Sequence, residues 1–157
     1  MKLRSYRIED TPEIINLFND TIHNINVRDY SKEQVEAWAS AKLDIEMWIN
    51  RLSNSFTYVA EENNQIIGFS NLEKNGHIDC FYCHHAFQRQ GVGTKILDSI
   101  ELQAKFLGIT KLFTEASITA KPFFISKNFI VVKEQEVECR GQLFINFVME
   151  KTIESFN

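Results

Sequence analysis

The chain has 157 residues, of which 44% are hydrophobic and 24% charged, and its net charge is −4 at pH 7. This length fits one domain covering residues 1–157, and the composition is typical of a globular protein rather than of a disordered chain. Because phosphate backbones attract clustered Lys and Arg, the acidic balance gives no reason to expect a nucleic-acid partner.

The first third of the chain predicts one short strand followed by three helices. Residues 3–8 alternate well enough for a strand. Thr11 and Pro12 fit the N-cap and the first position of a helix, where proline loses nothing by lacking an N–H group. Ser31–Gln34 has the form of a capping box before a second helix, and residues 44–52 predict a third.

From residue 56 onward the apolar period changes from about 3.6 to 2, which indicates strands. Residues 56–61 and 66–72 predict a hairpin around the turn formers at 62–65, and residues 77–83 follow as a central strand. The clearest helix covers 91–107, with Gly108 in the place of a C-terminal cap. The remainder predicts a strand at 111–115, a short helix at 119–127, and a closing hairpin of 129–138 with 142–150.

This order of elements predicts an α+β fold, with helices flanking a mostly antiparallel sheet. The strand–helix–strand passage around Gly91 adds a parallel pair, formed by residues 77–83 and 111–115. That pair lies at the centre of the predicted sheet.

The stretch Cys80-Phe81-Tyr82-Cys83-His84-His85 has the C-x-x-C-H spacing of haem attachment or of half a zinc site. Side chains three apart in a strand point to opposite faces, so the thiols of Cys80 and Cys83 cannot converge. The remaining cysteine, Cys139, and the other histidines show no ligand spacing with one another. The sequence therefore favours small buried cysteines over a metal or haem site.

A glycine loop follows directly, between the predicted central strand and the 91–107 helix. Backbone N–H groups at a helix N-terminus can bind an anion, and glycine lets the ligand approach closely. The dinucleotide fingerprint needs a third glycine where Ile96 stands, and the ATP-binding loop needs a glycine where Gln88 stands. Neither of these two motifs is present.

Gln88-Arg89-Gln90-Gly91-Val92-Gly93 resembles the Q/R-x-x-G-x-G/A signature of the GCN5-related N-acetyltransferase (GNAT) family. The order of elements is similar to that fold from end to end, and residues 120–129 resemble the family's A-x-x-F-Y-E-K-x-G-F segment. The resemblance implies that the loop binds the pyrophosphate of acetyl-CoA and that the parallel strands splay apart around the pantetheine arm. The cofactor-binding residues it implies are Phe81, Tyr82, Cys83, Gln88, Arg89, Gln90, Gly91, Val92, Gly93, Thr94, Ser117 and Phe124.

Two departures from the family pattern affect the predicted site. Phe124 stands where many members have a tyrosine proposed to protonate the departing CoA thiolate, and phenylalanine has no proton to give. Ser117 stands where an asparagine is common. Acetyl-CoA binding is still expected, whereas the acid is left unassigned.

The implied reaction is direct attack of a primary amine of a small molecule or protein on the acetyl thioester. The amine must lose a proton, and amides near Phe81–Cys83 are expected to stabilise the oxyanion. The period of 2 places His77 and Asp79 beside Phe81 on one face, so one or both are candidate bases. Tyr30, and less directly Tyr82, are candidates for the acid or for substrate contact.

The alternative to an enzyme is a CoA-binding sensor or interaction module without catalysis, which the missing tyrosine leaves open. The N-terminus lacks a signal-peptide pattern, no apolar segment approaches the roughly 20 residues that span a bilayer, and three cysteines do not suggest a disulfide framework. The sequence thus predicts a cytoplasmic acetyltransferase with no membrane partner and with a homodimer as one possible assembly.

Overall fold

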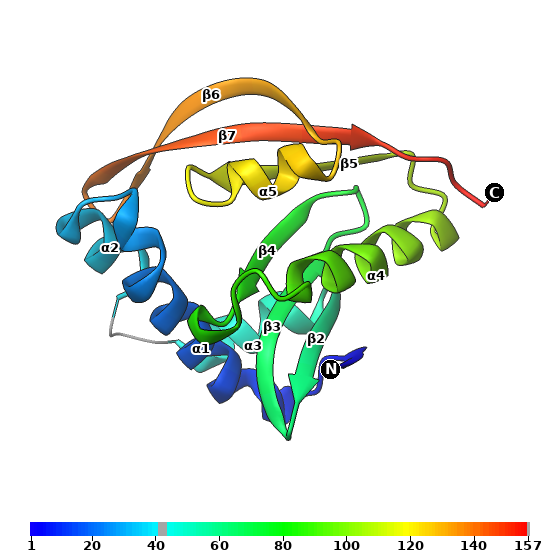
Figure 1. Cartoon of the computed structure of the whole chain (residues 1–157), viewed down its shortest axis with the longest axis horizontal. Helices are drawn as coiled ribbons and strands as arrows, with labels where there is room; N and C mark the ends of the chain where they lie inside the picture. The colour runs from blue at the N-terminus through cyan, green and yellow to red at the C-terminus, as the bar shows by residue number, and fades with distance from the viewer. Residues whose placement is uncertain (41–43, 157) are drawn as a thin grey trace.

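In the computed structural model, which describes residues 1–40 and 44–156, the chain forms two sheets flanked by helices (Figure 1). The strands and α-helices are β1 (Lys2–Ser5), α1 (Thr11–Asn24), α2 (Lys32–Trp38), α3 (Ile45–Ser53), β2 (Phe56–Glu62), β3 (Gln65–Leu72), β4 (Ile78–Cys83), α4 (Val92–Phe106), β5 (Lys111–Ser117), α5 (Lys121–Ser126), β6 (Ile130–Cys139) and β7 (Gln142–Thr152). Three short 3-10 turns join them, η1 (Ile8–Asp10), η2 (Asn26–Arg28) and η3 (His85–Phe87).

The helix starts follow the capping chemistry of the sequence. The Ser31 hydroxyl accepts a bond from the Gln34 N–H at 3.1 Å, and the Gln34 side chain accepts one from the Ser31 N–H at 2.7 Å, which confirms the capping box. The Asp44 carboxylate caps α3 in the same way, through the Met47 N–H at 3.0 Å. The first strand is shorter than predicted, because the Arg7 N–H donates to Asp10 and the chain turns into η1 there.

The α+β fold is as predicted, and its strands form two separate hydrogen-bonded sheets. One sheet has the antiparallel order β1-β2-β3-β4, and the other has the antiparallel order β5-β7-β6. Between the sheets, β4 and β5 approach in parallel at a single bridge, His77 with Phe113. The predicted parallel pair is therefore present, and it splays so early that the sheet divides there.

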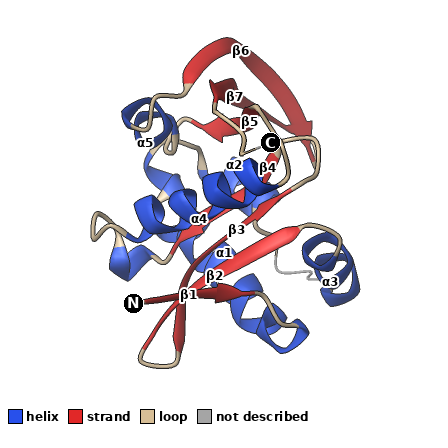
Figure 2. Cartoon of the chain, turned by 90° about the vertical axis from the view of Figure 1, so that its right-hand side faces the viewer, coloured by secondary structure: helices blue, strands red, loops and turns tan. Residues whose placement is uncertain are grey.

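Helices cover both faces of the sheets. The largest core cluster joins α4, the sheets and Phe124 of α5, whereas a second cluster lies under α1 and α3 and includes Trp48 and Phe69. In Figure 2 the β5–β7–β6 sheet lies above and the β1–β4 sheet below, with α4 seen between them. The opening between the sheets therefore lies among several elements that are distant in sequence.

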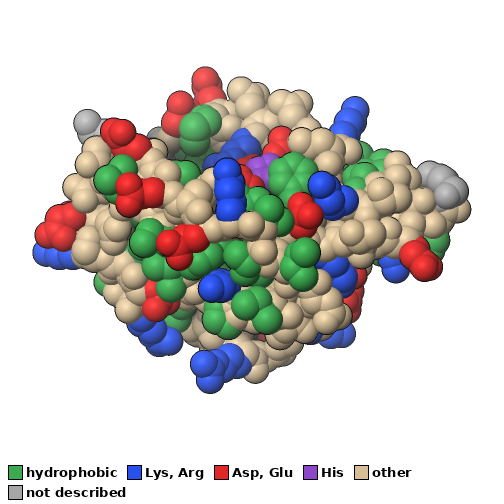
Figure 3. Space-filling model, turned by 90° about the horizontal axis from the view of Figure 1, so that it is seen from above, with side chains coloured by type: hydrophobic (Ala, Val, Ile, Leu, Met, Phe, Trp, Pro, Cys, Tyr) green, Lys and Arg blue, Asp and Glu red, His purple; other side chains and the backbone are tan. Residues whose placement is uncertain are grey.

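The outer β6–β7 side is the most exposed part of the β structure. Figure 3 looks down on this side, where hydrophobic side chains lie among charged ones. Ile130 is 63% exposed and Leu143 is 54% exposed. Within residues 1–40 and 44–156, no helix combines the length and apolar character that crossing a membrane requires.

Candidate active site

A groove of about 560 Å³ lies where β4 and β5 diverge. The strands are held together at one end, where the Phe113 N–H donates to the Gly76 carbonyl at 3.0 Å and the Thr114 hydroxyl donates to the Ile78 carbonyl at 2.9 Å. Just after β4, the His84 N–H donates to the Ile67 carbonyl of β3 at 2.8 Å. Successive N–H groups along a strand point to opposite sides of it, so the N–H groups of Phe81 and Cys83 point away from β3, toward the groove.

The glycine loop forms one end of this groove. Gly91 is the N-cap of α4 with φ of 83°, in the left-handed region, and the first backbone bond of the helix runs from the Lys95 N–H to the Gly91 carbonyl. The N–H groups of the first turn therefore have no partner within the helix. Gln88 braces the loop, because its side-chain amide donates to the Cys83 carbonyl at 2.8 Å.

Gly93 leaves room for a ligand beside α5. A Cβ at this position would lie 3.1 Å from the Phe123 ring and 3.5 Å from the Phe81 ring. A side chain larger than that of alanine would therefore enter this passage. The loop thus offers anion-binding N–H groups at its rim and a narrow apolar passage beyond, which fits a phosphate group attached to a thin chain.

The structure places the predicted cofactor residues around this groove with one exception. Gln90 is exposed outside the groove wall, and its side-chain amide donates to the Ala86 carbonyl at 3.5 Å. The predicted residues that line the groove are Phe81, Tyr82, Cys83, Gln88, Arg89, Gly91, Val92, Gly93, Thr94, Ser117 and Phe124.

Two of these residues have structural roles that the sequence did not reveal. Phe124 is 1% exposed and packs edge-on against Phe81 and Phe129, so it is a wall of the groove and part of the core. The Ser117 hydroxyl accepts the Ala120 N–H at 3.0 Å and thereby fixes the turn before α5.

One prediction about β4 is wrong, since His77 and Asp79 do not share a face with Phe81. A β-bulge opposite Asn71–Leu72 makes Asp79 an extra residue in the strand. The bulge breaks the alternation, so that Asp79 turns toward Arg51 of α3 while Phe81 packs on α5. His77 and Asp79 are neighbours all the same, as predicted.

The cysteines of β4 lie on opposite faces, as the alternation predicts for them. Cys80 packs in the cluster under α1 and α3, and Cys83 packs against the cluster under α4. Burial raises the pKa of Cys80 well above its ordinary range and that of Cys83 to about 12. Both are therefore neutral thiols near pH 7 that cannot act together as metal ligands.

His77 lies at the junction where β4 and β5 meet. Its ring stacks on Phe113, its Nδ1 bonds to Glu73, and its Nε2 bonds to Glu115 at 2.9 Å. The hydrogen bond with Glu115 is the largest influence and raises the pKa of His77. Burial lowers this pKa and the hydrogen bond with Glu73 raises it, so that the pKa is about 9. His77 is therefore an imidazolium at neutral pH, with both nitrogens occupied, and it does not line the groove.

Asp79 lines the groove as part of an ion pair. Its two oxygens accept bonds from Arg51 at 2.7 Å each, and one of them also accepts from the Asn71 amide at 2.9 Å. Burial alone would raise the pKa of Asp79, yet the bonds from Arg51 and Asn71 outweigh it and lower that pKa. Oxygen and nitrogen atoms of Glu73, His77 and Asp79 lie within 4.8 Å of one another, but each already has a protein partner.

The two candidate tyrosines differ in position. The Tyr30 hydroxyl donates to the Ile145 carbonyl at 2.7 Å and accepts from the Ile118 N–H at 2.9 Å; the residue is 6% exposed and lies outside the groove wall. Tyr82 does line the groove and stacks on Phe69. Burial raises the pKa of both phenols above the ordinary value.

Several groove residues were not identified from the sequence, among them Thr21, Asn26, Arg28 and Glu115. Glu115 could have been found, because the predicted parallel pair places it near the start of the central strand. Thr21 could not, since its bond to the Cys83 carbonyl at 3.0 Å joins residues 62 positions apart.

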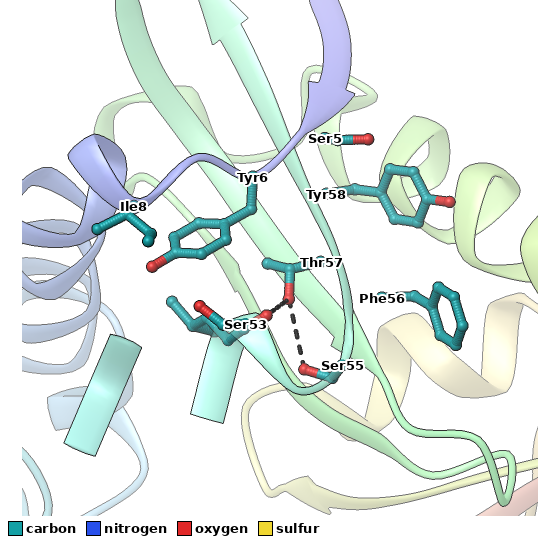
Figure 4. Close-up of a pocket in the computed structure, with 9 residues that line it drawn as sticks. Ser5, Tyr6, Ile8, Ser53, Ser55, Phe56, Thr57 and Tyr58 are labelled. Carbon is teal, nitrogen blue, oxygen red and sulfur yellow. Dashed lines mark hydrogen bonds between the residues drawn. The ribbon is translucent and has the colours of Figure 1, made fainter. Parts of the chain in front are cut away.

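A second hollow, of about 340 Å³, lies between β1, β2 and the end of α3 (Figure 4). Tyr6 and Thr57 lie in its wall, and the Thr57 hydroxyl donates to the Leu52 carbonyl at 2.7 Å. None of the predicted site residues lines this hollow. The groove between β4 and β5 is therefore the candidate active site.

Comparison with known proteins agrees with the geometry of the groove. Residues 26–151 match the family model described as an acetyltransferase (GNAT) domain. The chain is 34% identical over 150 residues to the uncharacterized N-acetyltransferase YafP of Escherichia coli (strain K12), covering 95% of this chain and 94% of that protein.

Solved structures give the same result. A crystal structure of a GCN5-related N-acetyltransferase from Rhodopseudomonas palustris superposes with a TM-score of 0.93 at 33% identity, covering 97% of this chain and 95% of the other. The structure of yncA, a putative acetyltransferase from Salmonella typhimurium with acetyl-CoA, has a TM-score of 0.75 at 16% identity, covering 100% of this chain and 96% of the other. The second likeness shows the fold alone.

Proposed function

The chain belongs to the GNAT family of acetyltransferases, and on that basis we propose that it transfers the acetyl group of acetyl-CoA to a primary amine within the β4–β5 groove. The observation that carries the proposal is the divergence of β4 and β5 beside a glycine loop. One opening thus combines an anion site, a narrow passage, and unpaired backbone N–H groups.

The groove residues fit acetyl-CoA in order along the groove. The first-turn N–H groups of α4 are suited to the pyrophosphate, because a helix N-terminus attracts anions. Gly93 leaves the passage beside Phe123 open for the pantetheine arm. The amides of Phe81 and Cys83 face the place where the thioester would then lie. This fit rests on residues that the structure brings together from β4, α4 and α5.

For the chemical step, we propose that the neutral amine attacks the thioester carbonyl, that the carbon–sulfur bond breaks, and that CoA leaves as the thiol. The Phe81 and Cys83 amides stabilise the negative charge that develops on the carbonyl oxygen. The proton lost by the amine supplies the proton gained by the thiolate, through groove water. No tyrosine at the position of Phe124 is then required.

Asp79 and Glu115 are proposed to attract the ammonium form of the acceptor, because both carboxylates line the groove. His77, as an imidazolium, has no lone pair free to accept a proton below about pH 9. We therefore assign His77 the role of positioning Glu115, and Tyr30 that of holding the turn after β5. Cytoplasmic location is proposed as well, supported by three free cysteines.

The direct test is thiol release from acetyl-CoA with a panel of polyamines, aminoglycosides, amino acids and peptides with free N-termini. We expect release that depends on at least one amine, together with CoA binding measured by calorimetry. Saturable CoA binding with no turnover on any amine would instead identify a CoA-binding module without catalysis.

Two glycine variants provide a matched pair for the cofactor site. Gly91 and Gly141 have φ of 83° and 82°, and a Cβ at either position would meet no atom within 4 Å. Gly91→Ala and Gly141→Ala should therefore cost a similar backbone strain of about 1–2 kcal/mol. Weaker CoA binding in the first variant alone supports the loop as the phosphate site, whereas equal binding in both contradicts it.

A further inference from the structure

Asn26 presents its side-chain amide to the groove. The residue is 5% exposed and lines the groove. Its backbone carbonyl accepts the N–H groups of Asp29 and Tyr30, whereas its side chain makes no hydrogen bond within residues 1–40 and 44–156. The amide keeps some contact with solvent, so it is accessible to a ligand in the groove. A hydrogen bond from it to a charged group contributes about 1.5–3 kcal/mol.

Arg28 lies two residues further on, in the same 3-10 turn, and also lines the groove. Its guanidinium is exposed and forms no ion pair or hydrogen bond with any part of the chain that the structure describes. Arginine presents a planar set of donors that matches a carboxylate. Two unused donor groups therefore lie on one short turn beside the groove.

The turn that carries Asn26 and Arg28 is held rigidly at the open end of the groove. The Thr119 hydroxyl donates to the Asp29 carboxylate at 2.7 Å, and the Tyr30 hydroxyl accepts the Ile118 N–H at 2.9 Å. Just before the turn, Thr21 of α1 is bonded to the Cys83 carbonyl. Because the turn is tied to β4 on one side and to the end of β5 on the other, little ordering is needed when a ligand binds.

Another part of the groove, near the junction of β4 and β5, is acidic. Asp79 follows the first residue of β4, and Glu115 is bonded to His77 at the point where β4 and β5 meet. The groove wall also has an apolar part, to which Ile25, Trp38 and Tyr82 contribute. A molecule that fits this arrangement carries a cationic amine and an anionic group on an apolar frame.

We propose that the acceptor is a small primary amine that also carries a carboxylate, and that Arg28 and Asn26 bind this carboxylate. The inference rests on the acetyl transfer proposed above, and it narrows the acceptor to amino acids and related compounds. Polyamines and aminoglycosides lack the group that Arg28 would recognise. Phosphates of the cofactor are the competing ligand for Arg28, and the test separates the two.

The probe is a set of amino acids, each compared with the amine that lacks its carboxylate, such as phenylalanine with phenethylamine and leucine with isopentylamine. The wild type should show a higher kcat/KM for the carboxylated member of at least one pair, by about 10- to 100-fold, as expected for hydrogen bonds to a charged group. Arg28→Ala and Asn26→Leu should remove that preference, because they lower kcat/KM for the carboxylated member of the pair more than for the decarboxylated amine.

Arg89→Ala is the matched comparison, because Arg89 is also exposed, lines the groove, and has no ion pair within the described residues. Arg89 lies in the phosphate loop, so its loss should raise the KM for acetyl-CoA, whereas Arg28→Ala should raise the KM for the acceptor. Thermal melting checks that each variant is folded. If Asn26→Leu does not fold, Arg28→Ala and Arg28→Lys test the proposal without it. Arg28→Lys should retain part of the preference for the carboxylated acceptor.

The proposal is overturned if decarboxylated amines are the better acceptors, or if Arg28→Ala changes the KM for acetyl-CoA and not the acceptor preference. Turnover with polyamines alone likewise overturns it while leaving acetyl transfer intact. Absence of turnover with every amine overturns the proposed function itself, so the two failures are distinguishable.

Discussion

The two ends of the β4–β5 pair belong to the same two strands and have opposite roles. At the closed end, His77 stacks on Phe113 and bridges two carboxylates, so nearly every polar group has a protein partner. At the open end, amides of β4 and of the first turn of α4 have none within the strands and the helix. The same two strands thus provide stability where their hydrogen bonds are satisfied and the proposed binding site where they are not.

The largest expected effect comes from filling the open end. Gly93→Val should reduce CoA affinity by about 100-fold or more, because a Cβ already lies 3.1 Å from Phe123 and the branched side chain enters the passage. Isothermal calorimetry with CoA measures the loss. Gly93→Ala, which requires only a small shift of the ring, is the control and should retain most of the binding. Unchanged affinity in Gly93→Val would mean that CoA does not pass between α4 and α5.

Asp79 lies between the two ends, and its loss should affect both stability and activity. Asp79→Asn weakens the bidentate pair with Arg51 and should cost about 1.5–3 kcal/mol of unfolding free energy, and about 10-fold in kcat/KM if the carboxylate attracts the ammonium. Asp10→Asn is the matched control, since Arg4 binds Asp10 with two bonds of 2.8 and 2.9 Å away from the groove. Equal losses of kcat/KM in both variants would show that Asp79 acts on stability alone.

Tyr30 tests whether a residue outside the groove wall takes part in the chemistry. Tyr30→Phe leaves the Ile118 N–H and the Ile145 carbonyl without this partner and should cost about 1–3 kcal/mol of unfolding free energy, with kcat retained. Tyr58→Phe, which removes one bond to Gln103 away from the groove, should cost less. A large fall in kcat of a stably folded Tyr30→Phe protein would restore Tyr30 as the candidate acid.

His77 should produce the smallest effect, as a pH dependence of stability at the closed end. Its pKa rises from the ordinary 6.5 to about 9 on folding, so its contribution is fully present below about pH 6.5 and is lost as the pH rises through about 9. Because Glu73 and Glu115 are partly exposed, the loss should be only about 1 kcal/mol. Chemical denaturation at several pH values measures it, and His77→Phe, which can still stack on Phe113, should flatten this dependence. A wild-type protein whose stability does not fall between about pH 6.5 and pH 9 would contradict the pairing of protonated His77 with Glu73 and Glu115.

The order of elements and the position of the glycine loop before α4 could be predicted because they depend on local patterns. Helical spacing, the capping box at Ser31 and the start of a helix at the glycine loop each depend on a few residues, so the sequence reveals them directly. The parallel pair followed from the strand–helix–strand order. The cysteines of β4 were placed correctly because the strand is regular between them.

The chemistry beside the loop was harder to predict because it depends on contacts between distant residues. One extra residue at Asp79 breaks the alternation of β4, and no pattern in the sequence marks that bulge. The role of Tyr30 depends on partners 88 and 115 positions away. Asn26 and Arg28 reach the groove only because η2 is tied to the end of β5, which a reading of single elements does not show.

The most direct test of the whole account is a crystal structure of the chain with coenzyme A. We predict the pyrophosphate on the N–H groups of the first turn of α4 and the CoA sulfur between β4 and β5, beside the amides of Phe81 and Cys83. Coenzyme A bound elsewhere, or a sulfur atom outside the gap between these strands, would contradict the claim that the open end of the β4–β5 pair is the active site.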